Sequence, residues 1–479
     1  MNPLARLILP ALRWRPRTGF RHEQRRIEAT LDLGVGGYIL FGGNAAAVRD
    51  LTRDVASAAP HRLLFASDLE RGAGQQFPDL THLPPPAALG FIGRADITAR
   101  CADVTAAEAR SVGLNWVYAP VADLDTEAEN PIVQTRSFGD DAARVSEHVA
   151  AWVRAAEAHG IATSAKHYPG HGRTTADSHA TLPVVDAPRD ALNADLEPFG
   201  AAVRAGTKSV MTAHVAYPAW DASALPASLS APVLRHLRAE LGFDGVIVSD
   251  ALIMEGILRG RGSSGAVVQA VAAGVDALLY PRDALAAARA LERAAPDQLP
   301  RARVDDALAR VARLADAVAA GPTPGAHPPE PNTAEHAAFA DAVADLAVHL
   351  LRGEQMSLRE PLDIAIVDDD VGGPYQVGRR DLFAQALEDA GLALGPGGSR
   401  IVLVYAEPRS WKSRASLGAS SVAALARLLP RASLVALFGH PRLMAQIGGD
   451  VPVVCAWHGQ PLMQRAAARW VVGQLREGR

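Results

Sequence analysis

Cysteine and lysine are both scarce in this 479-residue chain. Cys101 and Cys455 are its only cysteines, which excludes a disulfide framework. A chain of this length can bury a core large enough to fold without such cross-links. Basic residues are almost all arginine, because Lys166, Lys208 and Lys412 are the only lysines. Each lysine is therefore more informative about local chemistry than any one arginine.

The chain also lacks a long apolar segment and a large excess of charge. Lysine and arginine total 48 against 52 acidic residues, a net charge of −4. This balance favours neither a nucleic acid nor an anionic membrane as a partner. No stretch approaches the roughly 20 apolar residues of a membrane span. The apolar run at 7–12 is too short, and too interrupted by proline, for a signal peptide. We therefore expect a cytoplasmic protein with no membrane and no nucleic-acid partner.

Proline is concentrated at one place in the chain. The segment 321–332 reads GPTPGAHPPEPN, with five prolines among twelve residues. This composition is typical of an extended linker rather than of a packed element. We predict a first domain over residues 1–320, a proline-rich linker over 321–337, and a smaller domain over 338–479.

Eight short apolar runs occur in the first 320 residues. Each is followed by a loop and then by an Ala-, Arg- and Glu-rich segment of helical period. The runs cover residues 7–12, 37–41, 63–66, 115–119, 161–165, 209–213, 245–248 and 275–280. Eight β-then-α units predict a (β/α)₈ TIM barrel. A doubly wound open sheet is the competing arrangement, because periodicity alone does not separate the two.

Four further apolar runs lie in the second part of the chain. They cover residues 363–367, 401–405, 433–438 and 452–456, and helical patterns such as 380–392 and 420–429 separate them. This order predicts an α/β/α sandwich with an open parallel sheet. Its strand ends carry neither a GxGxxG nor a P-loop pattern, so a nucleotide is not expected and no cofactor is predicted. The domain could cap a cleft, form a homodimer, or have no catalytic role.

Polar residues follow five successive strands of the predicted barrel. The carboxyl ends of barrel strands meet at one rim, where the chemistry of such barrels is found. The residues at these strand ends are Asp68, Asp123, Arg136, Lys166, His167, His214 and Asp250. Taken singly, Asp68 could be a helix N-cap, Arg136 a surface ion pair and His214 a core histidine. Their succession along the chain nevertheless indicates a site at this rim.

Asp250 and the segment 167–179 are the sharpest candidates for chemistry. Asp250 directly follows the apolar run 245–248, and a carboxylate entering a cleft there can act as nucleophile, base or metal ligand. The segment 167–179 is polar and interrupted by glycines, as functional loops often are. It ends in Asp177-Ser178-His179, in which the carboxylate could hold the imidazole and raise its pKa. Such a histidine can give and take a proton near neutrality.

These motifs resemble glycoside hydrolase family 3, in particular its bacterial β-N-acetylhexosaminidase branch. The stretch KHYPGHG at 166–172, followed by DSH at 177–179, matches the pattern of that branch almost position for position. Further matches in the same order are Asn130-Pro131, the segment RSFG at 136–139 and the segment GVIVSD at 245–250. The resemblance covers residues 1–320 and extends loosely into the second part.

The resemblance implies a retaining double displacement that removes a terminal N-acetylhexosamine from glycans such as peptidoglycan fragments. Asp250 would be the nucleophile, and His179 the general acid/base that Asp177 orients. Binding of the terminal sugar would fall to Asp68, Arg136, Lys166, His167 and His214. Neither a metal nor a cofactor is implied. Retention needs a nucleophile and a proton donor on opposite sides of one bond, which two polar loops on one rim can supply. The 2-acetamido group is implied by the branch alone.

A histidine acid suggests that phosphate could replace water as the acceptor. Once His179 has given its proton it is neutral, so it repels an incoming anion less than a carboxylate would. Product analysis with and without phosphate tests this hypothesis, and unchanged release of free sugar would contradict it.

The sequence departs from the family pattern after the third strand. The usual D-x-E-G-G-R-x-Q-R is here DLERGAGQQ at 68–76, so Ala73 and Gln76 replace two arginines and Arg71 is new. The second lost arginine usually helps to bind sugar, which leaves the substrate preference open. Ala251 stands where a second aspartate is common, which should ease ionisation of Asp250.

Three alternatives remain open from the sequence. The first is a metal-dependent hydrolase, although the H-x-H pair that often opens such barrels is absent after the first run. Its metal ligands would come from His167, His171, His179, His214 and Asp250. A non-catalytic carbohydrate-binding scaffold is the second alternative, and the intact Asp250 and His179 argue against it. A family-3 β-glucosidase is the third, and such members usually lack the histidine loop.

Overall fold

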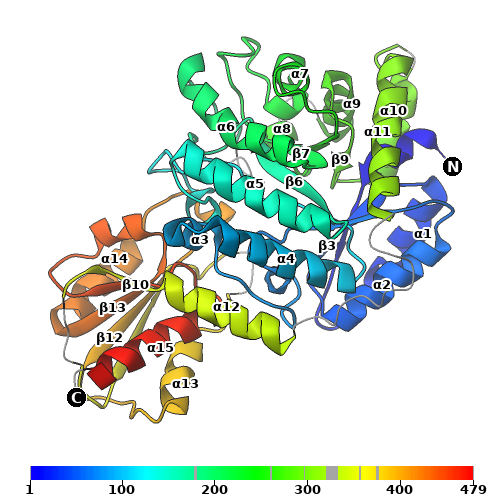
Figure 1. Ribbon diagram of the computed structural model, residues 1–479. Coiled ribbons are helices and arrows are strands. Elements are labelled where there is room, and N and C mark those ends of the chain that lie inside the picture. The colour runs from blue at the N-terminus through cyan, green and yellow to red at the C-terminus, as the bar shows by residue number, and fades with distance from the viewer. Residues whose placement is uncertain are drawn as a thin grey trace.

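The computed structural model of the chain describes residues 2–176, 181–258, 262–295, 297–319, 333–354, 358–373 and 377–477. The described residues form two α/β domains that lie side by side (Figure 1). The first contains nine short strands and the second contains five, on either side of the proline-rich segment.

The strands of the first domain close into a barrel. Seven of them form one parallel sheet in chain order: β2 (Ala11–Arg13), β3 (Gly37–Phe41), β4 (Leu64–Ser67), β5 (Trp116–Val117), β6 (Ala162–Tyr168), β7 (Ser209–Thr212) and β8 (Val246–Ser249). The remaining two, β1 (Ile8–Leu9) and β9 (Leu278–Leu279), pair in parallel with each other.

Two connections join this pair to the seven-stranded sheet. Val248 bridges Ala277, just before β9, and only Pro10 separates β1 from β2. Pro10 interrupts the strand because it has no N–H to donate. Its carbonyl nevertheless accepts a hydrogen bond from the Ile39 N–H. The ring therefore closes, and the predicted (β/α)₈ barrel is confirmed with all eight predicted runs contributing strand residues.

Helices surround the barrel between the strands. They are α1 (Gln24–Leu33), α2 (Ala45–Ala58), α3 (Pro86–Ile92), α4 (Ala95–Ser111), α5 (Ala142–Ala158), α6 (Arg189–Ala205), α7 (Ala231–Ala239), α8 (Glu255–Leu258), α9 (Gly262–Ala273), α10 (Ala284–Ala294) and α11 (Arg301–Ala319). Several begin at side-chain caps, since Asn44, Asp141 and Asp283 each accept a backbone N–H of the first turn. Helix starts are thereby fixed close to the strand ends.

The second domain is the predicted sandwich. Its sheet has the order β10-β14-β13-β12-β11, and its strands are β10 (His349–Arg352), β11 (Asp363–Asp368), β12 (Arg400–Ala406), β13 (Ala432–Gly439) and β14 (Val453–Cys455). The four predicted runs are its parallel strands. The sequence missed β10, an antiparallel edge strand beside β14.

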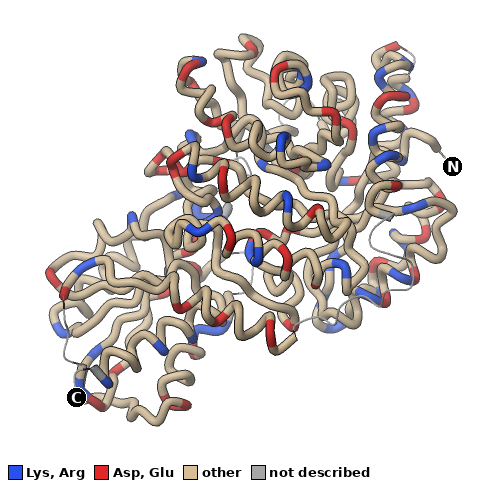
Figure 2. Tube along the Cα trace, viewed as in Figure 1, with Lys and Arg blue, Asp and Glu red and all other residues tan. Residues whose placement is uncertain are grey.

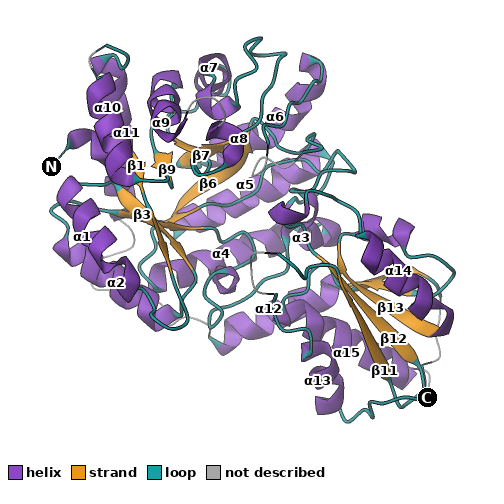
Figure 3. Ribbon diagram, turned by 180° about the vertical axis from the view of Figure 1, so that it is seen from behind, coloured by secondary structure: helices purple, strands orange, loops and turns teal. Residues whose placement is uncertain are grey.

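Alternation along β12 explains the two layers of helices. Ile401, Leu403 and Tyr405 pack toward one cluster, while Val402 and Val404 pack toward another, because successive side chains of a strand point to opposite faces. Helices α12 (Ala334–Ala347), α13 (Leu382–Asp389) and α15 (Pro461–Glu477) cover the first face, and α14 (Ala419–Leu428) covers the second (Figure 3). Helix α12 begins inside the predicted linker 321–337, most of which lies outside the described residues.

Several contacts hold the second domain against the barrel, and three of them lie near the barrel rim. Arg442 donates to the Asp125 carboxylate at 2.9 Å, and His440 contacts the same carboxylate at 3.1 Å. The Phe91 ring stacks on His349 with centroids 3.7 Å apart. Gln460 donates to the Leu83 carbonyl at 2.7 Å. These contacts fix the orientation of the second domain relative to the barrel rim.

Basic and acidic residues are interspersed along the chain in both domains (Figure 2). Among the described helices, none is both long enough and apolar enough to cross a membrane.

Candidate active site

A cavity of about 620 Å³ lies where the carboxyl ends of the barrel strands face the second domain. Five of the residues singled out from the sequence line it: Asp68, Arg136, Lys166, His167 and Asp250. They come from four separate strand ends that are far apart in the chain. The structure therefore brings these five predicted residues into one site.

A chain of ion pairs forms one wall of the cavity. The Lys166 ammonium lies 2.7 Å from an oxygen of Asp68 and 2.7 Å from an oxygen of Glu70. Arg136 binds both oxygens of Glu70, at 2.9 and 2.7 Å. Burial alone would raise the pKa of Glu70, but Arg136 and Lys166 hold it well below its usual range. Glu70 is therefore an anion near neutral pH, and it fixes the side chains of Lys166 and Arg136.

Asp123 anchors the segment that follows β6. One of its oxygens accepts the backbone N–H groups of His167 and His171, at 3.0 and 2.7 Å. The other oxygen lies 2.7 Å from Nδ1 of His167. Burial would raise the pKa of Asp123, but His167 and the backbone donors lower it. The fully buried carboxylate thus fixes both the backbone and one ring of this segment.

His171 is held as a neutral ring beside this anchor. Its Nδ1 lies 2.9 Å from the Thr174 hydroxyl, and burial lowers its pKa to about 4. Asn130 ties the same segment down, because its amide donates to the His171 carbonyl at 2.8 Å. The Asn130-Pro131 motif of the sequence is therefore a support for the histidine segment.

Asp250 reaches the cavity from the end of β8. All four residues of that strand are buried, and Asp250 is the first partly exposed residue after it. Its backbone N–H donates to the Thr212 carbonyl at 3.2 Å, and its carboxylate accepts the Ala251 N–H at 2.7 Å. A carboxylate held in this way by a rigid strand end can attack a ligand in the cavity.

His214 is not among the residues that line the cavity, and its predicted contact with sugar stays a prediction. Its ring is fully buried, with Nδ1 2.6 Å from the Ser228 hydroxyl and Nε2 3.2 Å from the Ala251 carbonyl. The ring supports the turn that carries Asp250. Asp177 and His179 lie outside the described residues.

The described residues give no support to the metal-dependent alternative. Among them, no group of three or more His, Cys, Asp or Glu side chains has the arrangement of a metal site. His167, His171 and His214 each direct Nδ1 to a neighbouring oxygen, in Asp123, Thr174 and Ser228.

The second domain completes the cavity with residues that the sequence analysis did not single out as functional. Glu407, Arg409 and Trp411 follow β12, and His458 follows β14. Burial would raise the pKa of Glu407, but His458, Arg409 and Arg380 hold it low, so it is an anion and not a proton donor. Burial lowers the pKa of His458 to about 3. The strand-end rule, applied to the second sheet, could have found these residues.

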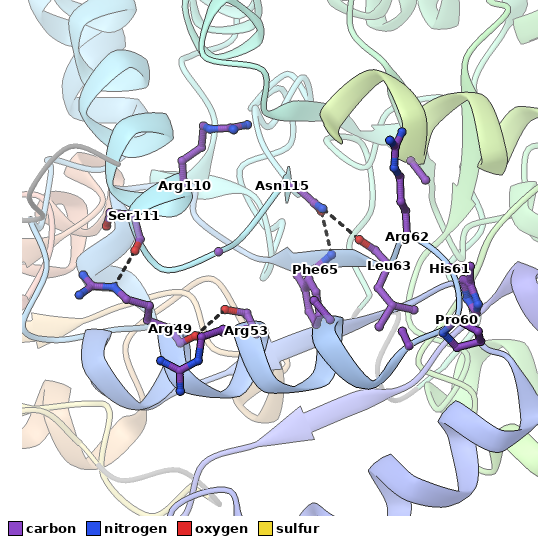
Figure 4. Close-up of a pocket in the computed structure, with 15 residues that line it drawn as sticks. Arg49, Arg53, Pro60, His61, Arg62, Leu63, Phe65, Arg110, Ser111 and Asn115 are labelled. Carbon is purple, nitrogen blue, oxygen red and sulfur yellow. Dashed lines mark hydrogen bonds between the residues drawn. The ribbon is translucent and has the colours of Figure 1, made fainter. Parts of the chain in front are cut away.

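A second cavity of similar size, about 640 Å³, opens at the opposite ends of β4 and β5 (Figure 4). The Asn115 side-chain amide joins the two strands there, since it donates to the Leu63 carbonyl and accepts from the Phe65 N–H. The Arg49 and Arg110 guanidinium groups point away from each other in Figure 4. No described lining residue is Asp or Glu. This cavity lacks the paired groups that glycoside chemistry needs.

Comparison with known proteins agrees with the fold. The sequence profile of the glycosyl hydrolase family 3 N-terminal domain matches residues 5–314. A β-N-acetylglucosaminidase/β-glucosidase of Cellulomonas fimi is 33% identical over 392 residues, covering 76% of this chain and 69% of that protein. A β-hexosaminidase of Vibrio cholerae is 35% identical over 277 residues, covering 56% of this chain and 82% of that protein.

Similarity to a solved structure extends over both domains. The family 3 β-N-acetylglucosaminidase of Paenibacillus sp. str. FPU-7 superposes with a TM-score of 0.86 at 27% identity, covering 99% of this chain and 96% of that one. The profile match spans the whole barrel, and the relatives named here carry the same family of activities in their names. The chain belongs to glycosyl hydrolase family 3.

Proposed function

We propose that this protein is a retaining exo-β-N-acetylglucosaminidase that removes terminal N-acetylhexosamine from glycans such as peptidoglycan fragments. The observation that carries the proposal is the position of Asp250, which lines one cavity with Asp68, Lys166, His167 and Arg136. The names of the relatives, which include β-hexosaminidase and β-N-acetylglucosaminidase, support the acetamido sugar.

The sugar would be bound by groups that are fixed before it arrives. Asp68 is held by Lys166, and Arg136 by Glu70, so neither needs to reorganise to meet a hydroxyl group. His167 is oriented through its bond to Asp123. Charged hydrogen bonds of this kind can place the anomeric carbon within reach of Asp250.

The reaction would proceed in two displacements. An Asp250 oxygen forms a bond to the anomeric carbon while the glycosidic C–O bond breaks, and His179 gives its proton to the leaving oxygen. Water then attacks the anomeric carbon as His179 takes back a proton, which breaks the bond to Asp250 and releases the sugar. Asp177 would hold His179 in orientation and stabilise its charged form.

A panel of 4-nitrophenyl β-glycosides that differ only at the 2-position tests the substrate. The proposal expects the 2-acetamido sugar to be hydrolysed with a kcat/KM at least about tenfold above that of the 2-hydroxy sugar. Proton NMR of the first product formed should show the β-anomer. A preference for the 2-hydroxy sugar, or an α-anomer as first product, would contradict the proposal.

Replacement of the nucleophile tests the role of Asp250. Asp250→Ala should lower kcat by at least about 10³-fold, as removal of a catalytic nucleophile does. Azide should then restore turnover by entering the space left by the carboxylate and should give an α-glycosyl azide. A matched control is Asp244→Ala, at an exposed carboxylate before β8 that lines neither cavity. Full activity in Asp250→Ala would end the proposal.

A β-glucosidase is the second candidate, and one observation favours it. Gln76 lines the cavity in place of a family arginine, and it accepts the Gly42 N–H at 3.3 Å. The Cellulomonas fimi relative carries both activities in its name. The same panel of glycosides decides between the two sugars. Repeating it with inorganic phosphate tests phosphorolysis, because a sugar 1-phosphate would then replace the free sugar.

A further inference from the structure

Arg71 is a cation on the cavity wall that has no carboxylate of its own. It lies three residues after Asp68, where this sequence departs from the family pattern. Its Nε donates to Gln460 of the second domain at 3.1 Å. Within the described residues, its two Nη atoms have no hydrogen-bond partner and no ion pair, and neither is sealed from solvent.

The backbone around Arg71 holds this side chain in a fixed place. The Arg71 N–H donates to the Gln75 side chain at 3.1 Å, and the Arg71 carbonyl accepts the Leu83 N–H at 3.0 Å. Gln460 bonds both the Arg71 guanidinium and the Leu83 carbonyl. The guanidinium group is therefore positioned by the barrel and the second domain together, and not by a flexible surface loop.

Both anions and cations lie near Arg71, namely Glu407 and Glu70 on one side of the balance and Arg409 and Arg136 on the other. Arg409 lines the same cavity, bonds Glu407 at 2.6 Å, and has a buried Nε with no hydrogen-bond partner. Glu407 also lies 3.6 Å from Arg380, so its single charge is shared among several cations. Burial lowers the pKa of Arg71, while the nearby Glu407 and Glu70 oppose that shift.

We infer that Arg71, with Arg409 beside it, forms an oxyanion subsite for the group on the far side of the scissile bond. The barrel residues Asp68, Lys166 and Asp250 are assigned to the terminal sugar. The remaining wall therefore faces the leaving group or the incoming acceptor. The edge of the Arg71 guanidinium that carries the two Nη groups matches a carboxylate or a phosphate. The ligand is either a carboxylate on the leaving group or inorganic phosphate as the acceptor.

The kinetic test compares two leaving groups and rests on the proposed function. Wild type and Arg71→Gln are assayed on 4-nitrophenyl and on 3-carboxy-4-nitrophenyl N-acetyl-β-glucosaminide. The subsite predicts that Arg71→Gln lowers kcat/KM for the carboxylated substrate by about tenfold to a hundredfold and changes the neutral one by less than about twofold. Arg71→Lys should keep part of the activity on the carboxylated substrate that Arg71→Gln loses. The control Arg25→Gln, at an exposed arginine of α1, should have the wild-type kcat/KM on both substrates.

A binding test needs no turnover, so it separates failure of the subsite from failure of the proposed function. Calorimetric titration measures the affinity of both proteins for inorganic phosphate and for 5-hydroxy-2-nitrobenzoate, the freed carboxylated leaving group. Weaker binding of phosphate alone by Arg71→Gln identifies the acceptor, and weaker binding of the benzoate alone identifies the leaving group. The inference is overturned if neither anion binds the wild type, if both proteins bind equally well, or if Arg71→Gln slows both substrates equally.

Discussion

Glu70 is the buried carboxylate that holds two cations of the cavity wall in place. It contacts Lys166 and Arg136 together, and its side chain is 5% exposed. Sequence reasoning named both cations but treated Glu70 only as part of a motif, because spacing does not reveal which anion compensates them. The pairing depends on the carboxyl ends of β4, β5 and β6 meeting at one rim of the barrel.

Glu70→Gln is expected to destabilise the protein and to weaken substrate binding. Removing one partner of a buried ion pair leaves uncompensated charge, which costs about 3–5 kcal/mol. Urea unfolding measures the loss, and KM should rise because Lys166 and Arg136 lose their anchor. The control Glu292→Gln, on the exposed side of α10, should change neither quantity. An unchanged unfolding midpoint in Glu70→Gln would contradict this account.

The contribution of Glu70 to the free energy of unfolding should decrease as the pH falls. The pKa of Glu70 is lowered in the folded state, so its stabilisation is present above the unfolded pKa of about 4.3 and is lost as the pH falls toward the folded value. The difference in unfolding free energy between wild type and Glu70→Gln should therefore shrink below about pH 4. A difference that grows on acidification would contradict the shift.

Asp123 is a buried carboxylate that supports the end of β6 and the segment after it. Asp123 accepts two backbone N–H groups and contacts the His167 ring, and the chain continues from there toward Asp177 and His179. The sequence placed Asp123 at a strand end but gave it no role. Its function as an anchor depends on backbone geometry, which residue identity does not encode.

Asp123→Asn is expected to lower kcat by about 10²-fold while the protein stays folded. Each bond to the charged carboxylate is worth about 1.5–3 kcal/mol, and the amide keeps the shape but not the charge. Unfolding curves at neutral pH serve as the control. A fall in stability with an unchanged kcat would indicate a purely structural role.

Gly172 allows the same segment to pass close to the loop after β5. A Cβ at this position would lie 1.6 Å from the Leu124 carbonyl oxygen, so the backbone of one loop must move. Gly172→Ala is therefore expected to reduce kcat by more than tenfold, because small displacements of catalytic groups are costly. Gly206→Ala, after α6, is a control for stability alone, since its Cβ would meet nothing within 4 Å although its φ of 96° strains alanine. Equal activities of both variants would contradict the prediction.

At the scale of the whole molecule, the sequence predicted two domains and their architectures but not their mutual placement. The eight barrel runs and the four sandwich runs follow from local periodicity. Contacts such as Arg442 with Asp125 join residues more than 300 positions apart, and no local pattern encodes them. For that reason Glu407, Arg409 and His458 were absent from the predicted site.

Arg442→Ala should loosen the second domain without unfolding the barrel. It removes bonds to the Asp125 carboxylate and to the backbone carbonyls of Asp125 and Glu127. Because the second domain forms one wall of the cavity, we expect KM to rise several-fold and kcat to change little. Arg427→Ala, at an exposed position of α14, is the matched control. Identical KM values in both variants would contradict a role for this contact in binding.

Neutral buried histidines should make the whole protein sensitive to mild acid. Burial is the main cause that lowers the pKa of His82 to about 4 and of His458 to about 3. Unfolded histidine titrates near 6.5, so the unfolded state binds more protons and stability falls as the pH drops from about 6.5 to about 4. Unfolding free energies at pH 7, 6 and 5 measure this slope, which His82→Gln should reduce. An identical slope in the variant would contradict it.

The carboxyl edges of two unrelated sheets face each other across one cavity. The residues that line it are therefore encoded in two separate stretches of the gene. If the proposed subsite is correct, substitutions in the segment 407–411 should change which leaving groups are accepted and leave the residues at the end of β8 unchanged.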